Sequence, residues 1–362
     1  MTTECVIRSP LLHTVREKTL RGERVSCDEG LLLLQSQEKE EIAAICHLAD
    51  EMRKKRVGDE ITFASTLMVY PTNLCELNCQ FCSFYAKPGW EKAWFNTPAQ
   101  IEEKIRHHPS LTEVHIVGGL WRDCNLGYYE ELFGRIKNVN PDIHIKALTP
   151  VEYDFLAKLH KISIEEVFRR MIDWGLGSLP GGGAEILVEE VRKKIAPGKI
   201  SSEEFLAIHE LVHKLGLRSN ITMLFGHVET EEHIIEHLRL VRDLQDKTGG
   251  FKTFIPLKFG EEDNALGKRK KQLHHKSLPL IYAVSRLMLD NIPNLKVLWN
   301  YVGIDEGLKL LQCGGNDFSS TNLEEKVIAM AGGTKVRMDV QSMEELIRSI
   351  NRVPRLTNSR EV

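Results

Sequence analysis

The chain has 362 residues, 42% of them hydrophobic, and its 48 basic and 51 acidic residues leave a net charge of −3. This balance excludes a surface built for nucleic acid or an anionic membrane, and the scattered cysteines exclude a disulfide framework in a chain of this size. The N-terminal region is charged throughout and carries no signal-peptide core, and the longest apolar runs are too short to span a membrane. We therefore expect a soluble cytoplasmic protein with no nucleic-acid and no membrane partner.

The first part of the chain is expected to be a helical lead-in. The pattern allows a short helix at Leu11–Leu20, and residues 37–55 place apolar side chains at helical spacing. A buried strand follows at Thr62–Tyr70. We therefore divide the chain into an N-terminal extension with a lead-in helix (1–58), a main domain (59–335) and a C-terminal helix and tail (336–362).

The main domain alternates predicted strands with predicted helices. Seven further strand candidates follow Thr62–Tyr70: 114–117, 143–148, 177–179, 218–224, 251–257, 295–299 and a short one near 316–318. The predicted helices between them begin with recognisable N-terminal capping sequences. One example is the capping box Thr97-Pro98-Ala99-Gln100, with proline at the first helical position. This rhythm predicts a parallel sheet. Eight strands suggest a complete (β/α)8 TIM-type barrel, with a partial barrel as the alternative.

Three cysteines follow the first strand directly, with the spacing Cys75-x3-Cys79-x2-Cys82. Thiolates are soft ligands that suit iron–sulfur clusters. Three of them can hold three irons of a four-iron cluster and leave the fourth iron open. The alternatives are a zinc site or ordinary buried cysteines, but zinc sites usually have four ligands and no second cysteine pair follows here.

Glycines mark two later strand ends. Gly118-Gly119 follows the second strand, and Gly181-Gly182-Gly183 follows the fourth. Without side chains, such residues let a ligand approach the backbone closely, although a simple turn is the alternative. We expect the second run to open a helix that carries Glu185 and Arg192 on one face, so that its amides and dipole face an anion.

These segments together resemble one subfamily of the radical S-adenosylmethionine (SAM) superfamily. It contains aminofutalosine synthase and cyclic dehypoxanthinyl futalosine synthase of the futalosine route to menaquinone, with the FO synthases as close relatives. The likeness covers roughly residues 60–340, and His115–Gly119, Ile143–Ala147 and Arg218–Asn220 look most like aminofutalosine synthase. The resemblance is carried by the cysteine loop 75–85 and by segments 115–120, 178–186, 223–230 and 244–251.

The resemblance implies a 4Fe–4S cluster on the three cysteines and SAM bound at its open iron. It also implies SAM contacts from residues in the matching segments: Phe81, Tyr85, Gly118, Gly119, Ser178, Gly182 and Glu185. Two departures stand out. Leu120 follows the glycine pair where the superfamily commonly has glutamate, so we expect no carboxylate there. Trp121-Arg122 replaces the subfamily's usual His-Pro.

The implied reaction is a radical transfer. The deoxyadenosyl radical formed from SAM adds to 3-[(1-carboxyvinyl)oxy]benzoate, and loss of carbon dioxide gives 6-amino-6-deoxyfutalosine. Because this enol ether of benzoate is a dicarboxylate, we expect polar residues on or after the fifth strand to hold it: Arg218, Asn220 and His227. An external one-electron reductant such as flavodoxin or ferredoxin is implied. The basic run 268–271 is expected to be a solvated loop, with guidance of an acidic donor as the alternative.

Other readings remain open. A hydrogen-abstracting enzyme of the cyclic dehypoxanthinyl futalosine synthase or FO synthase type would use the same cysteine loop and the same SAM position. A noncatalytic iron–sulfur electron carrier is the rival from a different class. Such a carrier would be expected to close its cluster with four protein ligands, whereas Cys75, Cys79 and Cys82 provide three.

Overall fold

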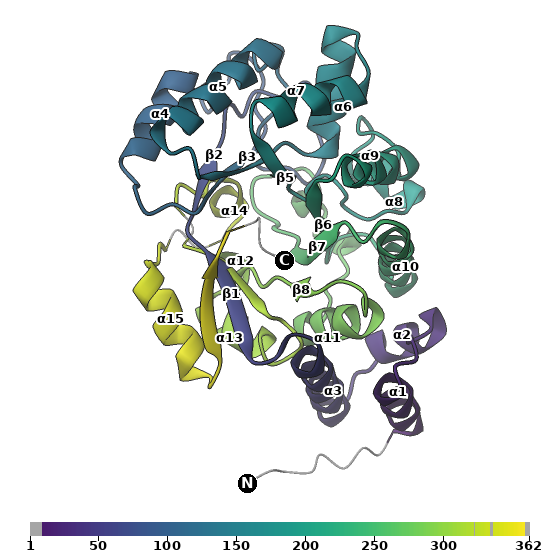
Figure 1. Ribbon diagram of the computed structural model, residues 1–362. Helices are drawn as coiled ribbons and strands as arrows, with labels where there is room; N and C mark the ends of the chain where they lie inside the picture. Colours follow the sequence, from purple (N-terminus) through teal and green to yellow (C-terminus); the bar gives the residue numbers. More distant parts are fainter. Residues whose placement is uncertain (1–8, 322, 334–335, 359–362) are drawn as a thin grey trace.

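The computed structural model describes residues 9–321, 323–333 and 336–358. Its centre is a parallel sheet of seven strands that follow one another in chain order, curved into a partial barrel (Figure 1). This arrangement confirms the predicted barrel class. The strands are β2 (Thr66–Val69), β3 (Glu113–Ile116), β4 (His144–Ala147), β5 (Leu176–Leu179), β6 (Arg218–Phe225), β7 (Phe251–Lys258) and β8 (Asn294–Leu295).

A second, three-stranded parallel sheet stands beside the open edge of this barrel. In it β1 (Glu60–Ala64) lies between β9 (Asp317–Ser320) and β10 (Val353–Thr357). Isolated bridges link the two sheets, from Lys296 to Asp317 and from Leu67 to Leu323. The predicted eighth strand is therefore present as β9, but it pairs with β1 rather than extending the seven-stranded sheet.

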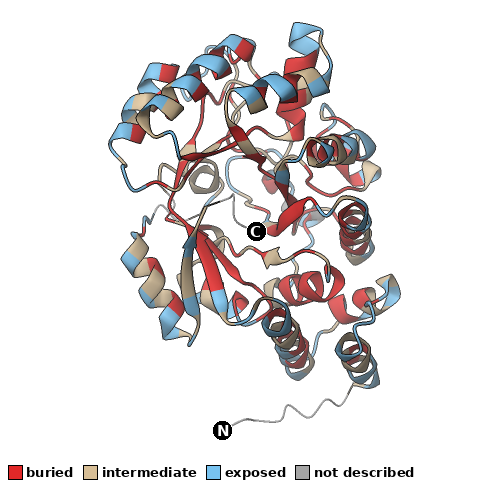
Figure 2. Cartoon of the chain, in the orientation of Figure 1, coloured by how far each residue is buried: buried red, intermediate tan, exposed pale blue. Residues whose placement is uncertain are grey.

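Helices cover the outside of the barrel, and their buried faces point toward the sheet (Figure 2). Each crossover from one strand to the next passes through at least one helix from β3 to β8, as parallel pairing requires. The outer helices are α4 (Pro98–Arg106), α5 (Leu126–Val139), α6 (Pro150–His160), α7 (Ile164–Asp173), α8 (Glu189–Ile195), α9 (Ser202–Lys214), α10 (Glu231–Thr248) and α11 (Leu278–Met288). Shorter elements after β7 are η1 (Gly267–Gln272), α12 (Trp299–Val302), α13 (Ile304–Leu310) and α14 (Val327–Met330).

The N-terminal lead-in consists of three helices, α1 (Pro10–Leu20), α2 (Cys27–Leu34) and α3 (Lys39–Val57), that lie against α10 and α11 (Figure 1). The helix α2 begins with a complete capping box between Ser26 and Glu29. Close packing fixes its position, since a Cβ atom at Gly30 would lie 2.7 Å from the sulfur of Met288. The lead-in therefore belongs to the same hydrophobic core as the barrel.

Several elements differ from the sequence-based expectation. The predicted strand Thr62–Tyr70 is two strands, because the backbone changes pairing partner at Ser65. The strand predicted at 295–299 is only two residues long, since Trp299 already begins α12. The C-terminal tail contains the helix α15 (Val340–Ser349) as expected, and also β10, which the sequence did not predict.

The expected helix after the glycine run begins late. Residues 180–188 form a loop, and α8 starts only at Glu189. Gly183 and Glu185 both have positive φ angles, of 92° and 49°, which an α-helix cannot accommodate. Glu185 and Arg192 therefore do not share a helical face, and no helix dipole points from this glycine run. Among the described residues, no helix is long and apolar enough to cross a membrane.

Candidate active site

The three cysteines of the motif lie on a loop that leaves the carboxyl end of β2. Cys79 is buried, Cys75 and Cys82 are half-buried, and all three line one cavity, which we call the cysteine cavity. The Lys87 ammonium donates to the carbonyl oxygens of Cys75, Glu76 and Leu77 at 2.8, 2.8 and 3.1 Å. One cation thus fixes the first turn of the loop, and Leu120 N–H adds a 3.4 Å contact to the Cys75 sulfur.

The environment of the thiols fits ligands of a metal cluster. Burial raises the pKa of Cys79 to about 11 and also raises the pKa of Cys82, so without a metal these two thiols stay neutral near pH 7. A bound metal would reverse this by deprotonating them. Among the described residues no three histidine, cysteine or carboxylate groups converge as a single ion requires, whereas a cluster distributes its thiolates over several irons.

The glycine pair after β3 faces the cysteine loop at very short range. A Cβ atom at Gly119 would lie 2.0 Å from the carbonyl oxygen of Leu74, directly before the first cysteine. At Gly118 it would lie 3.1 Å from the carbonyl oxygen of Thr72. Gly119 is therefore needed for contact between two loops of the protein itself, a role beyond the expected approach of a ligand. Both residues still line the cysteine cavity.

A carboxylate does reach this glycine pair, but from a different part of the sequence. Glu152, in the first turn of α6, accepts hydrogen bonds from Gly118 N–H at 3.0 Å and from the N–H and hydroxyl of Thr149 at 2.7 and 2.8 Å. Its side chain is buried and lines the cysteine cavity, and burial raises its pKa to about 7. This finding corrects the expectation, based on Leu120, that no carboxylate lies beside the glycines.

A cation and an aromatic ring complete the wall of the cysteine cavity. The ammonium of Lys199 lies 5.2 Å from the ring centroid of Phe81 and forms an ion pair with Glu185. Burial lowers the pKa of Lys199, but the Glu185 carboxylate outweighs that effect and the net pKa is raised, so this lysine stays charged. Glu185 thus acts on the cavity through Lys199. Tyr85 lines the same cavity and packs on Trp90 at 5.6 Å between ring centroids.

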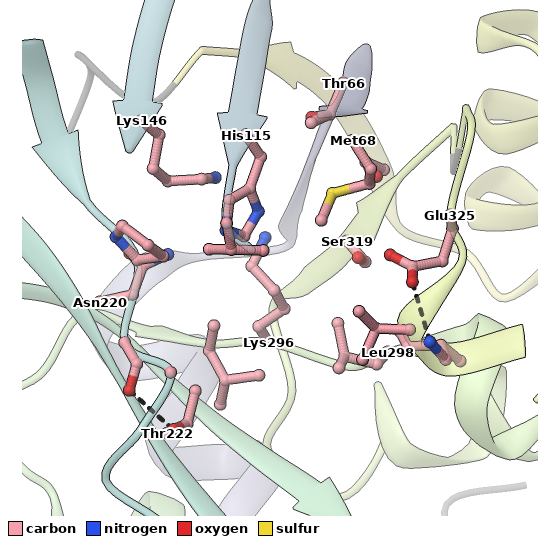
Figure 3. Close-up of a pocket in the computed structure, with 18 of the residues that line it drawn as sticks. Thr66, Met68, His115, Lys146, Asn220, Thr222, Lys296, Leu298, Ser319 and Glu325 are labelled. Carbon is pink, nitrogen blue, oxygen red and sulfur yellow. Dashed lines mark hydrogen bonds between the residues drawn. The ribbon is translucent and has the colours of Figure 1, made fainter. Parts of the chain in front are cut away.

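A second and larger cavity, of about 240 Å³, occupies the barrel interior (Figure 3). We call it the barrel cavity. It adjoins the cysteine cavity, because Val117, Thr149 and Val327 line both. Much of its wall is apolar, and polar side chains from strands of both sheets and from the segments around them project into it. Those labelled in Figure 3 are Thr66, His115, Lys146, Asn220, Thr222, Lys296, Ser319 and Glu325.

Two polar groups of the barrel cavity lack a hydrogen-bond partner within the described protein. They are the Nε2 atom of His115, on β3, and the Oδ1 atom of Asn220, on β6. Burial lowers the pKa of His115 to about 3, with nearby Lys146 adding to the effect, so its imidazole is neutral. Buried polar groups normally find partners. Each of these two groups is therefore available to a polar ligand group in the barrel cavity.

Both lysines of the barrel cavity are paired with a carboxylate, whereas Glu325 accepts a hydrogen bond from the hydroxyl of Tyr70 at 2.8 Å. Lys146 lies 2.6 Å from Glu113, and Lys296 lies 2.9 Å from Asp317. Glu113 also accepts from the hydroxyl of Thr66 at 2.8 Å. Paired in this way, the cations are held in fixed positions while their long-range field is largely cancelled. The cavity can therefore present oriented donors to an anion without a large net charge.

The other expected site residues have different positions. Of the three consecutive glycines, Gly181 and Gly182 line the barrel cavity and Gly183 lines the cysteine cavity. A Cβ at Gly182 would lie 3.2 Å from Thr149, whereas at Gly181 it would collide with the backbone of Ile221. Ser178 lies outside both cavities, and its hydroxyl contacts the His144 ring nitrogen Nε2 at 2.7 Å. This position offers no contact for SAM.

Of the three residues expected to hold the substrate, the structure brings only Asn220 to the barrel cavity. Arg218 is the first residue of β6, is exposed, and its guanidinium donates to the carbonyl oxygen of Gly249 at the amino end of the barrel. His227 is fully buried outside the cavity, 3.0 Å from Glu229, and its Nε2 contacts the carbonyl oxygen of Leu224. Both positions correct the expectation that these side chains bind carboxylates.

Three residues of the site were missed as candidates by sequence reasoning. Glu152 belongs to the capping box Thr149-Pro150-Val151-Glu152, which has the same form as the one recognised at Thr97. His115 stands in a segment that was singled out, but alternation along β3 could also have shown that it faces the barrel interior. Lys199 follows α8 without any local signal.

The fold and the cysteine loop define the class. The profile of the radical SAM superfamily matches residues 69–241. Methylornithine synthase, known from a crystal structure, has the same fold with a TM-score of 0.74, covering 94% of this chain and 97% of that one at 16% identity. The chain is therefore a radical SAM enzyme with a partial TIM barrel.

The relatives narrow this to one family. The profile of the "CofH/MqnC C-terminal region" matches residues 248–361. Aminodeoxyfutalosine synthase of Thermus thermophilus is 35% identical over 96% of this chain and 94% of its own length. Cyclic dehypoxanthine futalosine synthase of Streptomyces coelicolor is 36% identical over 95% and 86%. The chain belongs to the CofH/MqnC family of radical SAM enzymes, for which a 4Fe–4S cluster and SAM are the expected cofactors.

Proposed function

We propose that the chain is an aminodeoxyfutalosine synthase. In this reaction the 5′-deoxyadenosyl group of SAM is joined to 3-[(1-carboxyvinyl)oxy]benzoate, giving 6-amino-6-deoxyfutalosine, methionine and carbon dioxide. The likeness to the Thermus enzyme along almost the whole chain supports this proposal. The segments around His115, Ile143 and Arg218, which resemble the synthase, support it further.

The residues of the cysteine cavity suit the expected cofactors. Cys75, Cys79 and Cys82 would hold the cluster, and Glu152 beside Gly118 would accept a hydrogen bond from the amino group of SAM. The bound cofactors supply the reactive radical. The protein's part is to hold the ligands in place, and Lys199 contributes a fixed positive charge beside Phe81 that offers a partner to a carboxylate.

The observation that carries the proposal is the pair of unpartnered groups in the barrel cavity. His115 and Asn220 come from two different strands, and each leaves a buried polar atom without a partner in the described protein. Neutral imidazole and amide groups can both donate to a carboxylate, with the amide turned so that its NH2 faces the ligand. An aromatic ring fits the apolar wall of the same cavity. A benzoate-type substrate combines these two features.

The cyclic dehypoxanthine futalosine synthase reaction is the second candidate. The two curated relatives differ by only one percentage point in identity. Both enzymes would use the same cysteine cavity. They differ in whether the deoxyadenosyl carbon stays in the product or leaves with an abstracted hydrogen.

Product analysis with defined variants tests the proposal. The reconstituted, reduced enzyme is incubated with SAM and either candidate substrate, and adenosine-derived products are identified by mass. In Asn220→Leu, loss of a donor to a carboxylate typically costs about 1.5–3 kcal/mol, so adduct formation should fall at least tenfold while SAM cleavage continues. Ser219→Ala is the matched control on the same strand, because Ser219 contacts His209 and His213 outside the cavity.

The outcomes separate the two candidates. An adduct with the enol ether, reduced in Asn220→Leu but not in Ser219→Ala, supports the synthase. If the enzyme turns over only dehypoxanthinyl futalosine, its function is that of the cyclase and not that of the synthase. Equal loss in both variants would contradict the role given to the barrel cavity.

A further inference from the structure

Two segments with exposed cations contact one residue of the cysteine loop. Gln80 lies in the sequence between Cys79 and Cys82, and two basic segments meet it from separate parts of the chain. We call these cations the basic face; they are Lys193 and Lys194 at the end of α8, and Lys268, Arg269 and Lys271 in η1. All five are exposed. The sequence predicts a solvated loop at residues 268–271. In the structure this segment lies beside the cysteine loop.

Hydrogen bonds fix both segments against Gln80. Its N–H donates to the carbonyl oxygen of Ile195, the last residue of α8, at 2.7 Å. Its carbonyl oxygen accepts from Leu266 N–H, directly before η1, at 2.8 Å. Its side-chain oxygen accepts from the guanidinium of Arg269 at 3.3 Å. The basic face is therefore anchored to the residue that separates two of the expected cluster ligands.

The charges of the basic face are not neutralised by ion pairs. None of its five cations lies within ion-pair distance of a carboxylate among the described residues, although many other surface cations of this chain do. The two acids that begin α8 have other contacts: Glu190 lies 2.9 Å from His233, and Glu189 accepts from the N–H of Ser202. Glu262 and Asp263, which precede η1, are exposed and form no ion pair with these cations among the described residues. Unpaired surface cations keep a field that extends over about 8 Å at physiological salt and can steer an oppositely charged protein.

We propose that the basic face is the docking surface for an acidic one-electron carrier protein. The inference rests on the proposed function, because a cluster on Cys75, Cys79 and Cys82 must be loaded with one electron before SAM can be cleaved. The net reaction of the proposed function is redox neutral, so the product radical gives one electron back in each productive turnover, and only cleavage of SAM without product consumes electrons. The carrier supplies the loading electron and replaces those lost in this way. The loading electron leaves the reduced cofactor of the carrier, which is oxidised by one electron, and enters the cluster; no proton or atom is transferred. Docking at Gln80 places the carrier next to the expected cluster ligands, so the electron has a short path.

Binding and reduction are measured separately to test this proposal. The test variant replaces Lys193, Lys268 and Lys271 by Gln in the reconstituted holoenzyme. The control variant makes the same number of Lys→Gln changes at exposed positions on other elements: Lys39, Lys55 and Lys161. An acidic flavodoxin is the probe. Its Kd is measured by calorimetry at about 10 mM and about 150 mM salt, between which the screening length falls from about 30 Å to about 8 Å.

The basic face predicts a specific pattern. Flavodoxin should bind the wild type more weakly at the higher salt, and the test variant should bind about tenfold more weakly than the wild type at the lower salt. SAM cleavage driven by flavodoxin should fall with it, while cleavage driven by dithionite stays unchanged. The control variant should match the wild type throughout.

Other results would overturn it. Flavodoxin affinity that is equal in the test variant and the wild type, independent of salt, or reduced equally in the control variant would contradict docking at this face. Failure of the proposed function can be told apart from failure of the docking proposal. If the proposed function is wrong, dithionite will not drive SAM cleavage in the wild type. The Kd values still show where the carrier binds.

Discussion

Replacement of Glu152 by Gln is expected to weaken SAM binding without removing the cluster. The carboxylate accepts from Gly118 and from both donors of Thr149, and lines the cavity that contains the three cysteines. A hydrogen bond to a charged group contributes about 1.5–3 kcal/mol. The Kd for SAM should therefore rise about 10- to 150-fold in Glu152→Gln.

The assay must separate ligand binding from the capping role of the same side chain. Glutamine can keep the capping role, as Gln100 does in α4, and full loss of a helix cap would cost about 1 kcal/mol of folding stability. Glu29→Gln is the matched control, because Glu29 closes the capping box of α2 far from the cysteine loop. Calorimetry on the reconstituted enzyme measures the Kd for SAM and for 5′-methylthioadenosine, which has the adenosine and sulfur but neither the amino nor the carboxylate group.

The expected result is weaker SAM binding in Glu152→Gln, with methylthioadenosine affinity and iron content unchanged. Glu29→Gln should bind SAM as the wild type does. An unchanged Kd for SAM in Glu152→Gln, or an equal loss for both ligands, would refute the assignment of Glu152 to the amino group.

Three further predictions concern the same loops. Gly119→Ala should lose most of its iron on anaerobic reconstitution, because the new Cβ would collide with the Leu74 carbonyl at 2.0 Å; iron analysis at wild-type level would contradict this. Lys87→Met removes three donors to the cysteine-loop carbonyls and should speed iron loss to a chelator, measured by absorbance. Burial raises the pKa of Glu152 from 4.5 to about 7. Between these two pH values the folded state binds a proton that the unfolded state has released. The free energy of unfolding should therefore fall by up to about 3 kcal/mol as the pH rises from about 4.5 to about 7. Glu152→Gln should lack this slope in thermal unfolding at about pH 5 and pH 8, and an identical slope would contradict it.

Local patterns in the sequence were sufficient for the fold class. Apolar strands and capped helices alternate along the chain, and the structure contains them in that order. The incorrect predictions also arose from local sequence patterns. The helix expected after Gly183 was assigned from glycines and charges alone, but the loop has left-handed residues that no helix tolerates. The helix α6 was overlooked although its capping box was present in the sequence.

The candidate site was predictable where neighbours in the sequence build it, as for the cysteine loop. It was not predictable where distant segments meet. The contact between Glu152 and Gly118 joins segments that follow two adjacent strands, and Lys199 lines the cysteine cavity while it pairs with Glu185. Arg218 shows the converse: its residue type suggested carboxylate binding, but its position at the start of β6 directs it away from the barrel cavity.

The most direct test of the proposed function follows the 5′ carbon of SAM. The reduced enzyme is supplied with SAM labelled with ¹³C at that carbon and with 3-[(1-carboxyvinyl)oxy]benzoate, and the products are resolved by mass spectrometry. An aminodeoxyfutalosine synthase should place the label in an adenosine–benzoate adduct, with one carbon dioxide released for each adduct formed. Label found only in 5′-deoxyadenosine, with no adduct, would contradict the proposed function.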